Sequence, residues 1–394
     1  MPTKPTADRA AVMISELLYK RLSDFGLDFA VVFPTSPSLT QVGHLEDDEL
    51  RRAGARAHND YAWDMFRGYT DRLTPVAIIP NHTPTEAIAE LEYVHSLGFK
   101  AVCFAGLVSR PMAGAQGRYW DALALDSDYD YDPVWSKLQE LGLAGTFHTS
   151  TMYFGYRSQR SSFTYNHIGH FAAGAEALCK AFFLGGVPKR FPKLRIAFME
   201  GGAGWAVNLY NDLVRHWKTR NPDALQYLDP DNLDRDQLKA LMKAFGTPTM
   251  RTVVNGAALE TGRLFGSAPP PDKRDDFRHA GIQRVEQIRD QFVNSFYFGS
   301  EGEDPLVGTA FNRRVNACQA KLSMLLGSDI GHFDVLDMNG VLAEAYEQVE
   351  HGVLDENEFR EFSFENAARF WTSHNPDFFK GTVVEREVKN LLNS

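Results

Sequence analysis

Short apolar runs alternate with amphipathic segments along most of this chain, and that alternation constrains the fold more than any other feature. The run DFAVVFP, residues 28–34, has almost no polar alternation, as expected for a strand buried on both faces of a parallel sheet. The preceding segment, residues 8–24, has apolar residues at helical spacing and is followed by Gly26, where a helix end belongs. Strands and helices that alternate in one series favour a parallel α/β fold.

The same rhythm predicts seven strands, at residues 28–34, 74–80, 99–106, 143–150, 194–202, 295–301 and 321–329. It predicts helices at residues 8–24, 51–69, 83–97, 132–141, 172–185, 305–321, 340–351 and 358–371. Residues 207–294 interrupt the series because they are long, charged and helix-rich. We interpret them as a helical insertion over the mouth of a barrel, carrying substrate-facing surface or an oligomer contact. We expect residues 1–394 to form one barrel domain.

Composition narrows the class of partner. The formal charge of -10 and the absence of a Lys/Arg run argue against nucleic acid and anionic membranes, so we expect a small-molecule substrate. No apolar run reaches the roughly 18 residues that a membrane span needs, and the N-terminus lacks the apolar core of a signal peptide. Three widely spaced cysteines do not form a disulfide framework, which is typical of a cytoplasmic protein.

Four predicted strands end in polar residues that core packing does not require: His148, Glu200, Glu301 and Asp329. In an α/β barrel the carboxyl ends of all strands meet on one face, so these residues would surround one cavity. Imidazole and carboxylate groups bind zinc or a similar divalent ion, and a neighbouring Glu or His can transfer protons. The alternative for each is a polar strand end bonded to a nearby loop, and for Glu301 the two interpretations are evenly balanced.

Three further histidines lie near these strand ends in the sequence. His167 and His170 have i, i+3 spacing, which places them on one side of a helical turn, where one could reach a metal. The alternative is a histidine bonded to backbone at a helix start. His332 follows Asp329 by three residues and could donate a proton, bind substrate or support Asp329. We interpret the remaining histidines as surface or structural residues, with His44 undecided.

Several segments resemble the amidohydrolase-related family, which includes decarboxylases of aminocarboxymuconate semialdehyde and of hydroxybenzoates. They are DRLTPVAIIP and EAIAELEYVHSLGFKAVCF within residues 71–104, FPKLRIAFMEGGAGW at 191–205, LLGSDIGHFD at 325–334 and FENAARFW at 364–371. The resemblance implies a distorted (β/α)8 TIM barrel with one divalent metal, zinc first and manganese second. It implies metal ligation by His148 and Asp329. Glu200 stands where the family often has a catalytic histidine.

The chain departs from this family at its start. The family opens with a strand that carries an HxH, ExH or DxH pair, and nothing before Asp28 supplies one. We therefore expect a barrel that lacks the first strand, with unpaired edges that a partner chain could cover, and we expect a homo-oligomer. Either His170 or another residue completes the ligand set, or the metal site is broken. The simplest account is a sequence that begins downstream of the true start, or a natural truncation.

The resulting hypothesis is a metal-dependent hydrolase or decarboxylase of a small carboxylated, aromatic or conjugated substrate. We assign catalytic roles to Glu200, His332 and His167, and metal binding to His148, His170 and Asp329. Arginines that follow two of the strands could pair with a substrate carboxylate, although solvated loop arginines are the favoured alternative; they are Arg110, Arg157 and Arg160. The rival hypothesis is a catalytically inactive, metal-free barrel that acts as a binding or regulatory protein.

Overall fold

The computed structural model describes residues 4–35, 45–112, 114, 116–152, 154–254 and 274–393. Its main feature is a seven-stranded sheet, curled like part of a barrel, with the order β1-β2-β3-β6-β7-β8-β9. The strands are β1 (Ala30–Val32), β2 (Leu73–Ile79), β3 (Ala101–Phe104), β6 (Ala144–Phe147), β7 (Ile196–Phe198), β8 (Phe296–Glu301) and β9 (Ser323–Gly327). All neighbouring strands are parallel, so the predicted α/β class and the seven predicted strands are confirmed.

The sheet is open between β1 and β9, because no pairing joins these two strands within the described part of the chain. The N-terminal helices α1 (Thr6–Ala11) and α2 (Ser15–Arg21) lie beside the segment that follows β9. Ala11, Phe25 and Met338 form a small buried cluster there. A side chain at Gly331 would meet Val12 at 2.9 Å, which shows how closely the first helix approaches the end of β9.

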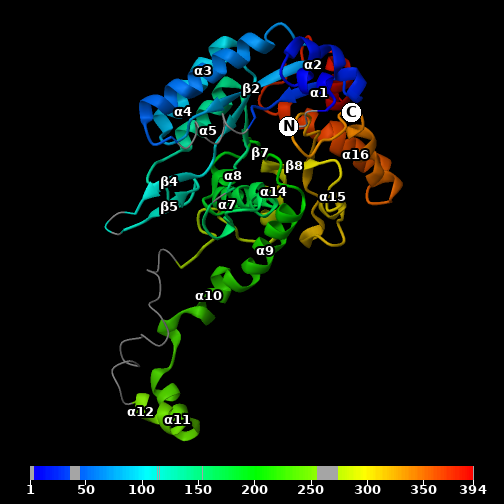
Figure 1. Ribbon diagram of the computed structural model, residues 1–394. Coiled ribbons are helices and arrows are strands. Elements are labelled where there is room, and N and C mark those ends of the chain that lie inside the picture. The colour runs from blue at the N-terminus through cyan, green and yellow to red at the C-terminus, as the bar shows by residue number, and fades with distance from the viewer. Residues whose placement is uncertain are drawn as a thin grey trace.

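Helices follow most strands and cover the sheet (Figure 1). They are α3 (Asp48–Phe66), α4 (Pro84–Leu97), α5 (Asp132–Leu141), α6 (Phe163–His167), α7 (His170–Leu184), α8 (Val187–Arg190), α9 (Gly204–Arg220), α14 (Glu286–Ser295), α15 (Val307–Phe311), α16 (Val341–Glu350), α17 (Glu356–Arg360), α18 (Asn366–Thr372) and α19 (Glu385–Asn393). Helix α4 shows why the helix ends could be predicted from the sequence. Thr83 and Glu86 form a capping box, Pro84 begins the helix, and Gly98 ends it in the left-handed conformation.

The predicted series differs from the structure in three places. The helix expected at residues 305–321 is reduced to α15, because the Asn312 side chain accepts hydrogen bonds from the backbone N–H groups of Arg314 and Val315 and turns the chain. An antiparallel hairpin was not predicted; its strands are β4 (Val108–Pro111) and β5 (Arg118–Asp121). Helix α19 was also missed.

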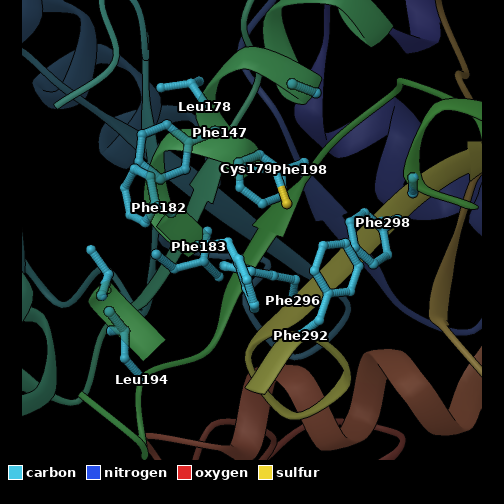
Figure 2. Close-up of a cluster of buried hydrophobic side chains, with 14 of the residues drawn as sticks. Phe147, Leu178, Cys179, Phe182, Phe183, Leu194, Phe198, Phe292, Phe296 and Phe298 are labelled. Carbon is cyan, nitrogen blue, oxygen red and sulfur yellow. The ribbon is translucent and has the colours of Figure 1, made fainter. Parts of the chain in front are cut away.

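Aromatic residues fix the middle of the sheet against its covering helices (Figure 2). Phe147, Phe198 and Phe298 come from adjacent strands, and the Phe198 ring lies 5.8 Å from Phe147 and 6.3 Å from Phe298. Phe182 from α7 and Phe292 from α14 pack onto these rings, at 5.3 Å from Phe147 and 5.6 Å from Phe298. This packing holds rigid the strands whose ends carry the candidate site.

The opposite face of the sheet is covered by the C-terminal region. Ala197 precedes Phe198 in β7 and therefore points to the other face. It belongs to a second buried cluster that includes Ile78 from β2 and Phe370, Trp371 and Phe378 from the C-terminal segment. Both faces of the strands are thus buried, as their uninterrupted apolar sequences predicted.

Of the described residues between α9 and α14, those in three helices extend away from the rest of the molecule (Figure 1). They are α10 (Pro222–Leu228), α11 (Arg235–Phe245) and α12 (Pro248–Val253). Residues 255–273 of the expected insertion lie outside the described residues, and its place over the barrel mouth remains a prediction. None of the helices in the described residues is long and apolar enough to cross a membrane.

Candidate active site

The ends of β6 and β7 bring His148 and Glu200 into contact. His148 directly follows β6, and its Nε2 lies 2.8 Å from Glu200 Oε2. Both side chains are only 12% exposed. Glu200 has φ +53°, in the left-handed region that residues other than glycine rarely adopt. Such a backbone at a strand end is held by its surroundings and is common at functional sites.

The glycines after Glu200 explain how this turn forms. The N–H groups of Gly201 and Gly202 both donate to the Gly299 carbonyl of β8, at 3.2 Å. A Cβ at Gly201 would lie 2.4 Å from the Trp205 indole nitrogen, so only glycine fits. The Asp304 carboxylate then accepts from the Ala203 N–H at 2.8 Å, where α9 begins. The segment EGGAGW therefore forms a turn that fixes the orientation of the Glu200 side chain.

A second pair lies beyond the end of β9. His332 Nδ1 is 2.6 Å from Asp329 Oδ1 and 3.8 Å from Glu200 Oε1, which connects this pair to the first. Asp329 has φ +49° and is therefore the second site carboxylate in the left-handed region. Its other oxygen, Oδ2, is buried and has no hydrogen-bond partner. A buried carboxylate oxygen without a partner costs about 1–3 kcal/mol, which a bound cation would offset.

The pKa values show how crowded with negative charge this region is. Burial, together with the charges of Asp329 and Glu200, raises the pKa of Glu301 to about 8. Burial and Glu200 also raise the pKa of Asp329 to about 6. The hydrogen bond to Asp329 raises the pKa of His332 to about 9, so its imidazole is a cation at neutral pH. Partly buried carboxylates held this close together favour binding of a positive ion.

His170 and His167 lie next to these pairs. His170 Nδ1 is 3.0 Å from Ser150 Oγ, and its backbone carbonyl accepts from the Thr151 hydroxyl at 2.6 Å. The His167 and His170 ring centroids are 4.8 Å apart. Phe171 joins the groups, because its ring centroid is 3.8 Å from that of His170 and 4.6 Å from that of His148. Burial lowers the pKa of His170 to about 3, so this ring is neutral.

The structure therefore brings the six predicted site residues into one region, but it does not group the predicted metal ligands as expected. Among the described residues, two clusters have donor atoms within 4.8 Å of one another: Glu200, Asp329 and His332, and Glu301, Asp329 and Asp334. His148 and His170 flank these clusters instead of joining Asp329 in one set. The carboxylates, the imidazole and the unpartnered oxygen of Asp329 fit a divalent cation in ligand type.

The predicted substrate arginines have other roles in this structure. Arg110 is buried and forms an ion pair with Asp121 as well as a hydrogen bond to the Tyr131 hydroxyl. Arg157 donates to the Ile168 carbonyl at 2.6 Å, and Arg160 is exposed. The alternative, solvated loop arginines, does not describe Arg110, which is buried and paired, while exposed Arg160 accords with it. His44 lies outside the described residues.

Sequence reasoning missed three residues near the site: Asp334, Ser150 and Phe171. Asp334 shares a cluster with Glu301 and Asp329, and its signal was an acid five residues after a strand-end acid. Proximity to a strand-end site residue could also have identified Ser150, because it follows His148 by two residues. Phe171 gave no signal, since one aromatic residue in a helix is ordinarily core.

The comparisons with known proteins agree with this architecture. The sequence model of the amidohydrolase family matches residues 17–247, so the chain belongs to that family. The resemblance inferred from the sequence motifs is thereby confirmed. No match was found among curated proteins.

Solved structures of similar fold include an amidohydrolase from Mycobacterium avium subsp. paratuberculosis K-10, with 19% identity, a TM-score of 0.56, and coverage of 93% of this chain and 76% of that one. The 2,6-dihydroxybenzoate decarboxylase from Rhizobium is 15% identical, with a TM-score of 0.52. The match covers 91% of this chain and 88% of the decarboxylase. A third structure is a dihydroxybenzoic acid decarboxylase from Polaromonas sp. JS666 with bound manganese and the inhibitor 2-nitroresorcinol. It is 14% identical, with a TM-score of 0.52, and the match covers 93% of this chain and 88% of the decarboxylase. At these identities the likeness shows the fold alone.

Proposed function

We propose that this chain is a metal-dependent enzyme of the amidohydrolase family, a decarboxylase or hydrolase that acts on a small carboxylated, aromatic or conjugated substrate. One observation carries the proposal: two histidine–carboxylate pairs meet at the strand ends, and one buried oxygen of Asp329 has no partner. Membership of the family and the fold shared with dihydroxybenzoate decarboxylases support it.

The residues that would hold the metal are Glu200, Asp329 and His332, whose donor atoms form one cluster. Zinc and manganese are the two candidate ions, because both accept carboxylate and imidazole ligands. When bound, the ion would act as a Lewis acid toward a substrate oxygen or lower the pKa of a water. His148 and His170 would support the site from its edge.

The chain's own groups supply the proton transfers. In a decarboxylation the bond between the carboxyl carbon and the ring breaks, its electron pair stays on the ring carbon, and that carbon takes a proton as carbon dioxide leaves. We assign this proton transfer to the Glu200–His148 pair, whose atoms are 2.8 Å apart. In a hydrolysis the same pair would take a proton from the attacking water. To bind the ion through its imidazole, His332 would have to lose the proton that its contact with Asp329 stabilises in the metal-free protein.

The experiment is a turnover assay with purified protein supplied with zinc or manganese. A panel of hydroxylated benzoates and their esters or amides separates loss of carbon dioxide from hydrolysis, with products followed by chromatography. The proposal predicts turnover in at least one class that chelation abolishes. Binding of panel members without turnover, and without dependence on metal, would favour the inactive binding barrel instead.

A further inference from the structure

The helices α10, α11 and α12 form an arm, residues 222–253, in which α10 contacts α9 and α11 contacts α12. No residue of these three helices is buried, and Figure 1 shows them extending away from the body of the molecule. They contain 7, 11 and 6 residues. Helices of this length are marginal alone in water, and their stability normally comes from packing an apolar face. Within the described part of the chain no residue of these helices is buried, so a further packing surface would stabilise the arm.

The apolar face of α11 shows what kind of surface that is. Leu238, Leu241, Met242 and Phe245 follow the i, i+3, i+4, i+7 spacing that places them on one stripe. Leu241 is 49% exposed and Phe245 is 85% exposed. Large apolar side chains gathered on one exposed stripe are characteristic of protein–protein contacts. The stripe is narrow, as in helices that pair with another helix.

The charges along the arm identify the partner. Acidic residues are confined to its first half, at Asp223, Asp229, Asp231, Asp234 and Asp236, where Arg235 is the single base. The second half, residues 237–253, has three bases and no acid; they are Lys239, Lys243 and Arg251. Arg274 pairs with Asp229 and Asp231, so the acids left for a partner at the start of α11 are Asp234 and Asp236.

Such an arm is complementary to itself when two copies run antiparallel. The acidic start of each α11, with Asp234 and Asp236, then faces the basic end of the other, with Lys243, twice, about a two-fold axis. A parallel pairing would instead place like charges together, which is destabilising. An unrelated partner would have no reason to match this division of charge.

We propose that the arm is a dimerisation element, in which α11 of one copy packs antiparallel against α11 of a second copy of this chain. The apolar stripe supplies the attraction and the divided charge sets the direction. The proposal is independent of the candidate active site, since none of its residues belongs to the arm.

The first test is sedimentation velocity of the full chain over a range of concentrations. The wild type is expected to be dimeric, and Leu241→Asp and Phe245→Asp are each expected to weaken the dimer at least about tenfold, because a charge on the stripe loses apolar burial. Both positions are exposed, so the circular dichroism spectra of the two variants should match that of the wild type, which would show that the fold is unchanged. The matched control is Val315→Asp, a 61% exposed apolar site on the body, which should remain dimeric.

The second test uses charge reversal. One variant carries Asp236→Lys, at the start of α11, and the other carries Lys243→Glu, near its end. Each alone should dimerise more weakly than the wild type at low salt, because both contacts become repulsive. An equimolar mixture should recover dimer as the heterodimer, in which both contacts are again attractive. A monomeric wild type at about 100 µM, a dimer indifferent to the stripe variants, or a mixture with no recovery would each overturn the proposal.

Discussion

His332 Nδ1 lies 2.6 Å from Asp329 Oδ1, while the other oxygen of Asp329 is buried without a partner. One carboxylate thus performs two tasks: it orients an imidazole with one oxygen and offers the other to a ligand. Its left-handed backbone at φ +49° places both oxygens at the end of the sheet. The candidate site is built around this residue and the neighbouring pair of Glu200 and His148.

Replacing Glu200 by glutamine tests the proton-transfer role. The change keeps the size of the side chain and removes its ability to carry a proton, so kcat should fall about 10²–10⁴-fold with a smaller change in KM. The measurement is steady-state kinetics on whichever substrate class the panel identifies. Glu347→Gln, an exposed position on α16, is the control and should behave as the wild type. Unchanged kcat in the Glu200 variant would remove this residue from the chemistry.

Gly201→Ala tests the turn that aims Glu200. Its Cβ would lie 2.4 Å from Trp205 Nε1, so the buried indole or the turn must shift, at a cost of about 1–3 kcal/mol. Urea unfolding should show this loss of stability. The control is Gly68→Ala, where a Cβ meets nothing within 4 Å and a small gain of up to about 1 kcal/mol is expected. Equal stabilities for the two variants would contradict the close packing.

His374 should make the fold sensitive to acid. Its Nε2 accepts a hydrogen bond from the Arg195 N–H at 3.0 Å, and burial, with the charge of Arg195, lowers its pKa from 6.5 to about 4. Because the folded-state pKa is depressed, the neutral ring stabilises the fold above pH 6.5, and this contribution is lost as the pH falls toward 4. The loss by pH 4 is about 2–3 kcal/mol.

The variant His374→Gln separates this effect from general acid unfolding. Glutamine can accept the same backbone hydrogen bond and does not titrate, so its stability should decline less between pH 7 and pH 4 than that of the wild type. Urea midpoints at intervals of pH provide the comparison. Parallel pH profiles for the two proteins would show that His374 titrates alike in the folded and unfolded chains.

The sheet was predictable because its strands are buried on both faces and therefore consist of continuous apolar runs. Helix α5 was predicted with the bounds that the structure has, Asp132–Leu141, since a proline and a glycine mark its two ends. The helix at 305–321 failed because periodicity does not reveal that the Asn312 side chain will turn the chain. The β4–β5 hairpin is short and partly exposed, and it gives no comparable pattern.

The candidate site was predictable in its members but not in its pairing. His148, Glu200 and Asp329 were found because parallel strands carry their ends to one edge. Which side chains meet depends on backbone angles such as φ +53° at Glu200, and no sequence pattern specifies them. His148 was accordingly expected on the metal with Asp329, whereas the structure places it against Glu200. The ligand role of each histidine remains a prediction.

Metal analysis of the purified chain tests the central claim most directly. After incubation with zinc or manganese and removal of excess ion, inductively coupled plasma mass spectrometry should find about one ion per chain in the wild type, and Asp329→Asn should lose at least about tenfold in affinity. Asp337→Asn, an exposed acid in the same loop, should retain the ion. Trace metal in the wild type, or equal content in the Asp329 variant, would contradict the account.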